Sequence, residues 1–262
     1  MTILKHELRR SRVSWLIWTG AVGALLITCI FLFPEMKDQM AGVGEMFSSM
    51  GAFTTAFGMD RLNFGTLTGY YAIECGNVLG LGGAFYAALT GAGMLAKEEN
   101  GRTAEFLLTH PVSRRCVTAE KLLALAVLIT AMNLAVYGLA AGSMLAIGEP
   151  VPWKELNLLH LAYYLMQLVL VGICFGISAF LRGGSVGLGI GIAVGLYFLN
   201  LIANITEKAA VLKHFTPFGF CDGAEIVSSG TLEAGWIAVD LAVGAACVLA
   251  AFLYYPRKDI HT

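Results

Sequence analysis

The sequence predicts an all-α integral membrane protein, a single bundle of six transmembrane helices. Two observations lead to this fold class. First, the chain of 262 residues is 57% hydrophobic and only 13% charged, about half the charged fraction of ordinary soluble proteins. Second, it contains six apolar stretches with few or no charges, and each reaches the length of about 20 residues that crosses a bilayer. Because a membrane offers no water to backbone groups, such stretches form helices, and none shows the alternation of barrel strands.

The six predicted spans belong to one domain, residues 1–262. The first is expected to end at Pro34, and the sixth is interrupted by Asp240. Trp15 in the first span and Trp236 in the sixth lie near span ends, where they suit the membrane–water interface. We expect the spans over residues 13–33, 75–96, 122–148, 156–181, 183–204 and 234–255.

Lysine and arginine residues predict the orientation of the chain. Six spans place both termini and the second and fourth loops on one side, which holds twelve of the 17 Lys and Arg residues. The positive-inside rule assigns this side to the cytoplasm. We therefore expect a multi-pass protein of the cell membrane, that of a bacterium, with both termini cytoplasmic. The net charge of −1 gives no reason to expect a nucleic-acid partner, whereas membrane lipid surrounds such a chain.

Two short helices are expected outside the spans. Residues 1–12 set apolar side chains such as Ile3 and Leu8 against basic ones, a pattern typical of an interfacial helix lying on the membrane surface. An unstructured basic tail is the alternative. Near the sixth span Pro217 breaks the chain, and residues 224–227 are expected to form a brief helix after it.

The densest charge of the chain lies between the second and third spans. In residues 97–121, KEENGRTAEFLLTHPVSRRCVTAEK, nine of the 25 side chains carry a formal charge. A short amphipathic helix is expected within this segment, ended by Pro111, and Ser113 is expected to cap the helix of the third span. Such an amphipathic helix can rest on the bilayer or insert into a groove of a soluble partner. The residues themselves leave both roles open.

This layout resembles the permease subunit of a type-2 ABC transporter, of the exporter class. The matching pattern in residues 97–121 is an acidic pair, Gly-x-Thr, Glu-x-Leu-Leu, Pro-Val-Ser-Arg and a lysine that starts the third span. Arg102 stands where the family commonly has another residue. The resemblance extends over the six spans and the basic N-terminal helix.

The resemblance implies that the amphipathic segment is a cytoplasmic coupling helix that docks on a separate ATP-binding subunit. Two permease chains and two ATPase chains would form the working unit, with ATP and Mg²⁺ bound by the ATPase and no cofactor bound by this chain. The sequence has no G-x-x-x-x-G-K-[ST] phosphate loop, so we expect a non-catalytic membrane subunit. The residues implied to contact the ATPase are Glu98, Glu99, Arg102, Glu105, Phe106 and Leu107.

Small residues recur at every fourth position in two spans. Such faces allow close helix packing in lipid, either within one chain or against a second permease chain. The resemblance favours the fifth span for a permease dimer interface. Its small residues are Gly183, Gly187, Gly191 and Gly195; those of the second span are Gly76, Gly80, Ala84, Ala88, Ala92 and Ala96.

Five polar residues within or beside the spans are candidates for a transport pathway. Interfacial solvation is the alternative for the two carboxylates, and hydrogen bonding between helices is the alternative for the three amides. The five are Glu74, Asn133, Gln167, Asn200 and Asp240. The six cysteines are scattered and the histidines lack ligand spacing, so no metal site is expected.

Two other function classes compete with an ATP-driven permease. A secondary transporter would need ionisable residues at the membrane midplane, and an intramembrane lipid-modifying enzyme would need a cluster of catalytic groups. The sequence shows neither arrangement. Nothing in the spans selects among drugs, peptide antibiotics, lipids, polysaccharide precursors and ions as cargo.

Overall fold

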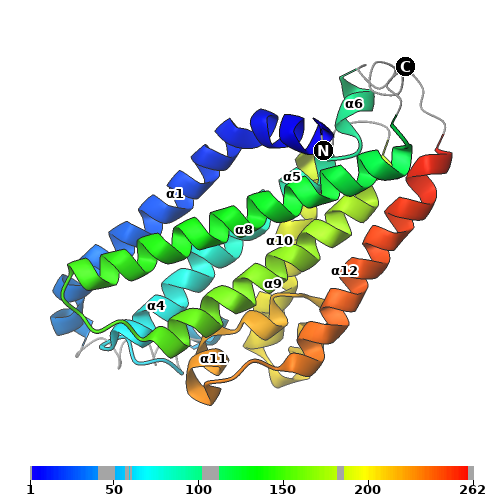
Figure 1. Ribbon diagram of the computed structural model, residues 1–262. Coiled ribbons are helices and arrows are strands. Elements are labelled where there is room, and N and C mark those ends of the chain that lie inside the picture. Colours follow the sequence, from blue (N-terminus) through cyan, green and yellow to red (C-terminus); the bar gives the residue numbers. More distant parts are fainter. Residues whose placement is uncertain are drawn as a thin grey trace.

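The computed structural model describes residues 2–40, 51–56, 59, 61–101, 112–181 and 186–258 (Figure 1). Within these ranges six helices are long and apolar enough to cross a membrane, which confirms the predicted all-α membrane bundle. In Figure 1 these helices run side by side, with the first turns of the chain and the end of the last long helix at one end. We call this the terminal end of the bundle and the opposite end the far end.

The long helices follow one another along the chain. They are α1 (Thr2–Met40), the continuous helix formed by α4 (Leu67–Cys75), η1 (Gly76–Gly80) and α5 (Leu81–Gly93), then α8 (Arg114–Ala146), α9 (Trp153–Ser178), α10 (Val186–Ile205) and α12 (Ala234–Tyr254). The short elements are α3 (Ala52–Ala56), α6 (Lys97–Asn100), the 3₁₀ segments η2 (Glu207–Phe215), η3 (Gly219–Cys221) and η4 (Tyr255–Arg257), and α11 (Gly223–Ser229).

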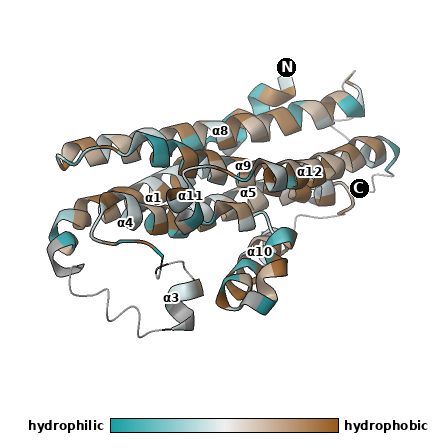
Figure 2. Ribbon diagram, turned by 90° about the horizontal axis from the view of Figure 1, so that it is seen from below, coloured by the Kyte–Doolittle hydropathy of each residue, from teal (hydrophilic) through white to brown (hydrophobic). Residues whose placement is uncertain are grey.

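Helix α9 forms the centre of the bundle. It packs against α5 on one side and α12 on the other, while α1 packs against α8 and α10 against α5. In its most apolar stretch 67% of the residues are buried, compared with 17% in α10 and α12. Apolar residues also cover the outer faces of the helices (Figure 2). A soluble protein rarely exposes so much apolar surface, so these faces fit contact with lipid.

Glycines allow α9 to approach both neighbours closely. A Cβ atom at Gly172 would lie 2.9 Å from the backbone oxygen of Gly244 in α12. On the opposite face, a Cβ atom at Gly91 of α5 would lie 2.9 Å from the Cβ of Cys174. Neither contact leaves room for a larger side chain. Van der Waals packing between close backbones is a main source of helix association in a membrane.

The helix that carries the first predicted span continues past Pro34, where we expected it to end. Helix α1 continues through Pro34 to Met40, because residues on both sides of the proline contact other parts of the chain. Phe33 packs against the ring of Tyr70 with a centroid distance of 5.4 Å, and Lys37 pairs with Glu149 at 2.9 Å. Membrane helices tolerate proline where such contacts compensate. The expected N-terminal interfacial helix is continuous with this span, and its first turns lie at an angle to the rest in Figure 1.

The helix that carries the second predicted span begins eight residues before that span. Helix α4 starts at Leu67, capped by Thr66, whose hydroxyl accepts from the amide of Gly69 at 3.2 Å. The start of α4 is apolar and packs into the core, including Tyr70 and Tyr71. Glu74 therefore lies inside a helix rather than at its outer end.

Local signals correctly predicted two helix starts. Ser113 caps α8, with its hydroxyl accepting from the amide of Cys116 at 3.2 Å. Near the sixth span, Asp222 caps α11, which ends at Gly230 in the left-handed conformation with φ of 62°. Residues 102–111, which include most of the predicted amphipathic helix, lie outside the described residues.

We expect Gly172→Val to lower the thermal midpoint of the detergent-solubilised chain. The added side chain would meet the backbone of α12, and overpacking of this kind destabilises by about 1–3 kcal/mol. Size-exclusion chromatography after heating would measure the loss. Gly142→Val in α8 is the matched control, since a Cβ atom there meets no described atom within 4 Å. An equal fall in both variants would assign the effect to helix propensity and refute the close contact.

Candidate functional site

Buried ion pairs gather at the terminal end of the bundle around Lys121 of α8. The Lys121 side chain has 0% exposed surface. Its Nζ donates to the carbonyl oxygen of Met94 at 2.7 Å and to Oε2 of Glu98 at 2.5 Å. It also lies 3.6 Å from a carboxylate oxygen of Glu7 in α1, which pairs with Lys97 as well. We refer to Glu7, Lys97, Glu98 and Lys121 as the ion-pair cluster.

A second buried pair joins the end of the last span to the same region. Nζ of Lys258 lies 2.6 Å from a carboxylate oxygen of Glu99 and donates to the carbonyl of Leu181 at 2.5 Å. The carbonyl of Lys258 accepts from the guanidinium of Arg114 at 2.6 Å. These contacts hold the ends of α8, α9 and α12 to α6.

The structure places two of the residues implied to contact a partner inside the chain. The carboxylate of Glu98 faces Lys121, and that of Glu99 faces Lys258. Each buried charge is therefore paired, which is the condition under which a protein tolerates it. Both side chains are mostly covered. The other four residues of that set, Arg102, Glu105, Phe106 and Leu107, lie outside the described residues.

Sequence reasoning did not single out Glu7, Lys121 or Lys258 for a role. One signal was present, since Lys121 directly precedes an apolar run of more than 20 residues. A lysine at such a position needs either a water-exposed end or an acidic partner. The identity of that partner depends on contacts between separate helices, which no local pattern reveals.

Two of the five polar candidates bond to one another in the middle of the bundle. Nδ2 of Asn133 in α8 donates to Oε1 of Gln167 in α9 at 2.7 Å and to the carbonyl of Ile129 at 2.9 Å. Nε2 of Gln167 makes a long hydrogen bond of 3.4 Å to the carbonyl of Leu79 in η1. The π-helical turn η1 interrupts regular α-helical bonding, and such turns are frequent at functional sites. Here the amide pair links α8 and α9 to that turn.

The other three polar candidates are separated. Glu74 accepts a hydrogen bond from the thiol of Cys29 in α1 at 3.4 Å. Asp240 lies half-buried within α12. Asn200 of α10 lines a pocket at the far end. The described residues therefore do not bring the five candidates together into one pathway.

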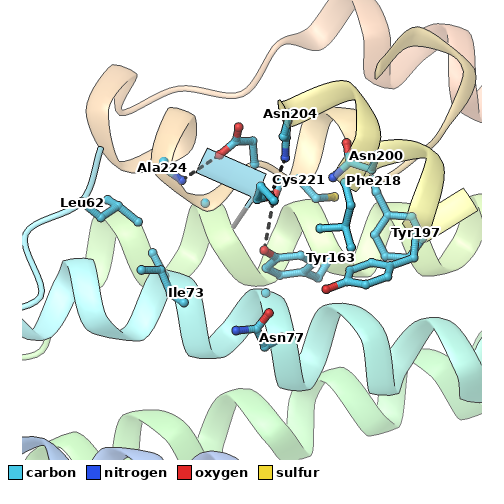
Figure 3. Close-up of a pocket in the computed structure, with 16 residues that line it drawn as sticks. Leu62, Ile73, Asn77, Tyr163, Tyr197, Asn200, Asn204, Phe218, Cys221 and Ala224 are labelled. Atoms are coloured by element: carbon cyan, nitrogen blue, oxygen red, sulfur yellow. Dashed lines mark hydrogen bonds between the residues drawn. The ribbon is translucent and has the colours of Figure 1, made fainter. Parts of the chain in front are cut away.

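The far-end pocket lies between α4, η1, α9, α10 and the segment before α11 (Figure 3). Its volume is about 70 Å³, below the roughly 300–1,000 Å³ of typical ligand pockets. Tyr163 crosses it and donates its hydroxyl to the carbonyl of Cys221 at 2.9 Å. Asn204 lies one turn after Asn200 and donates to the carbonyl of Ala56 at 3.1 Å.

An acidic side chain closes the far-end pocket. Asp222 pairs with Arg61 at 2.6 Å and lies 3.5 Å from Nζ of Lys213. Burial alone would raise the pKa of the Asp222 carboxyl, but the hydrogen bond and charge of Arg61, with help from Lys213, lower it below its usual value. The carboxylate thus stays ionised while it caps α11 and ties two loops together.

The two stripes of small residues have opposite surroundings. In the second span the stripe packs inside the chain, and Ala84, Ala88 and Ala92 are fully buried. In the fifth span Gly187, Gly191 and Gly195 are exposed, and a Cβ atom at each would meet no described atom within 4 Å. We call these three residues the open glycine face. Gly183 lies outside the described residues.

We expect Lys121→Met to lower the free energy of unfolding by about 3–5 kcal/mol, because it leaves a buried carboxylate without its cation. Titration with sodium dodecyl sulfate would measure the change. The matched control is Lys37→Met, which breaks the exposed pair with Glu149 and should cost about 1 kcal/mol or less. Adding Glu98→Gln to Lys121→Met should restore part of the loss. Equal effects at the two lysines would refute a buried ionic network.

Among the described residues, no three His, Cys, Asp or Glu side chains lie close enough to hold a metal ion.

No curated protein matches the chain. The family model described as "ABC-2 family transporter protein" matches residues 1–219. These include the first five long helices and residues 97–121, here called the charged loop. The chain therefore belongs to the ABC-2 transporter family, whose members are permease subunits of ABC transporters.

Proposed function

We propose that this chain is the membrane-spanning permease subunit of an ATP-driven exporter, driven by a separate cytoplasmic ATPase that binds ATP and Mg²⁺. Membership of the ABC-2 family supports the permease role. The excess of Lys and Arg at the terminal end supports a cytoplasmic position for that end. The absence of a phosphate-loop motif from the sequence supports a separate source of ATP hydrolysis.

The observation that carries the proposal is the anchoring of the charged loop on both sides. Lys97, Glu98 and Glu99 precede residues 102–111, and Lys121 follows them; all four take part in ion pairs. A force applied to the intervening segment therefore reaches α1, α8 and the end of α12. This is the arrangement that a docking segment for a motor subunit requires.

The anchoring divides the loop residues into two roles. Glu98 and Glu99 position the loop through Lys121 and Lys258. Contact with the ATPase is assigned to Arg102, Glu105, Phe106 and Leu107, in the helix-in-groove mode.

We expect Glu105→Arg combined with Leu107→Asp to abolish capture of the ATPase while leaving the chain inserted in the membrane. Glu105→Arg reverses the charge at the proposed contact, and Leu107→Asp places a carboxylate where an apolar side chain would be buried. Like charges across an interface cost several kcal/mol. A mild-detergent pull-down from the native cells measures the association.

Glu149→Arg, a charge reversal at the far end of the bundle, serves as the control and should retain the ATPase. Recovery of an ATP-binding protein in the same amount with the double variant would refute docking through this loop. Its absence from the unmodified sample would refute the ATP-driven assignment altogether.

A second permease chain is proposed to cover the open glycine face. Exposed glycines let the backbones of two helices approach in lipid. The opposite side of α10 is already used within the chain, where a Cβ atom at Gly189 would lie 2.8 Å from the carbonyl of Ala88. The described residues do not bring the five polar candidates together within one chain, so the transport pathway is proposed to form between the two chains.

We expect Gly191→Cys to form a cross-linked dimer under mild oxidation in membranes. The native cysteines would first be replaced by Ala or Ser to remove background. Gly142→Cys in α8, another exposed glycine with no described neighbour within 4 Å, should stay monomeric. Equal cross-linking at both positions would indicate random collision, and none at Gly191 would refute this interface.

A further inference from the structure

The first turns of α1 have one face packed on the bundle and one face that the described residues leave uncovered. On the packed face, Glu7 is only 1% exposed and belongs to the ion-pair cluster. The amide of Leu4 donates to Oε2 of Glu120 in α8 at 2.9 Å. The uncovered face carries the exposed side chains of Lys5, His6, Arg9, Arg10 and Arg12.

This basic face continues into the surface that faces lipid. Lys5, Arg9 and Arg12 are spaced by four and three residues, which places them on one side of a helix. They form no ion pair with any described residue. Leu16 follows Arg12 by four residues on the same side and is 61% exposed, and nearby Val13 is 58% exposed. The exposed surface of α1 therefore changes from basic to apolar within about one turn, as it does where lipid headgroups give way to hydrocarbon.

The order of charge along this face selects an anionic phospholipid as its partner. A lipid whose acyl chains lie against Leu16 has its phosphate toward Arg12, about 6 Å away along the axis at 1.5 Å per residue. Arginine binds phosphate through two parallel hydrogen bonds, and each further Lys or Arg adds to the attraction of an anionic leaflet. An acidic surface on a soluble protein would match the charge as well, but it would not account for the apolar continuation of the same face.

We propose that the first turns of α1 bind the headgroup of an anionic phospholipid in the leaflet at the terminal end, and that this binding stabilises the ion-pair cluster. Glu7 connects the two events, because it lies on the same turns, pairs with Lys97 and lies 3.6 Å from Nζ of Lys121. A ligand that binds only the folded form of a segment reduces its local unfolding. A bound lipid therefore keeps Glu7 beside both lysines, which lie on either side of residues 102–111. The lipid contact goes beyond the proposed function, whereas its effect on ATPase docking rests on that function.

Photolabelling of the full-length chain in phosphatidylcholine nanodiscs tests the lipid contact. Two probes carry a diazirine in one acyl chain, one with a phosphatidylglycerol headgroup and one with a phosphatidylcholine headgroup. We expect phosphatidylglycerol to label peptides around Leu16 at least about fivefold more than phosphatidylcholine, the effect of about 1 kcal/mol from a single basic side chain. Arg9→Gln with Arg12→Gln should remove most of this preference. Arg9→Lys with Arg12→Lys should retain most of it, because the charge is kept.

Arg257→Gln is the matched control for the labelling. Arg257 is exposed at the same end of the bundle but belongs to η4 rather than to α1, so its loss should leave the preference around Leu16 unchanged. Equal labelling by the two probes in the unmodified chain would overturn the lipid contact and assign the basic face to a soluble acidic partner. A preference that survives Arg9→Gln with Arg12→Gln would overturn it as well.

Amide hydrogen exchange of residues 97–101 tests the link to the ion-pair cluster. Exchange should be slower in nanodiscs of phosphatidylglycerol than in those of phosphatidylcholine, by no more than the preference found in photolabelling, because a ligand shifts an equilibrium only by its difference in binding. Glu7→Gln should keep the labelling around Leu16, which shows that it is folded, and lose this lipid dependence. Equal exchange of the unmodified chain in both lipids would refute the link, whether or not Glu7→Gln folds. Neither measurement contains an ATPase, so a failure here is distinct from a failure of the permease assignment.

Discussion

The positive charge of Lys121 is the constraint on which the terminal end of the bundle depends. This side chain has 0% exposed surface, and it is tolerated because Glu98 and Glu7 surround it with negative charge. Removing water from an ion costs several kcal/mol even in real proteins. Separating the three groups would leave a buried charge unpaired, which is costly. Because they belong to α1, α6 and α8, the start of the chain and both sides of the charged loop behave as one unit.

The membrane itself makes much of this fold predictable. A span must be long, apolar and helical, so six apolar runs were enough to predict six helices. The predictions of where helices end were weaker, because packing overrides local signals. Pro34 was expected to end the first span, but Phe33 packs against Tyr70 of α4 and Lys37 pairs with Glu149 in the loop between α8 and α9. The early start of α4 was missed for the same reason. Tyr70 and Tyr71 of α4 pack into the core, and no local pattern reveals that contact.

The sequence predicted where the charged segment lies, but it did not predict which residues form its ion pairs. The density of charge in residues 97–121 indicated a special loop, yet Glu98 pairs with a lysine 23 positions later on another helix. The small-residue stripes show the same limit. One pattern describes both the second and the fifth span, but Ala88 is buried and Gly191 is exposed. Sequence periodicity identifies a face of a helix, and only the arrangement of the other helices determines what that face contacts.

A single continuous helix connects the two ends of the molecule. At the terminal end, the carbonyl of Met94 accepts from Lys121 just beyond α5. At the far end, α4 begins beside the loops that Asp222 ties together, and Gly223 lies against the backbone of Ala72. Between them, Gln167 holds the π-helical turn η1 through Leu79. Under the proposed function, a displacement of the charged loop is carried along this helix to the far-end pocket. The turn η1 is the point where that helix departs from regular α-helical bonding, and under the proposed function it is where the two ends move relative to one another.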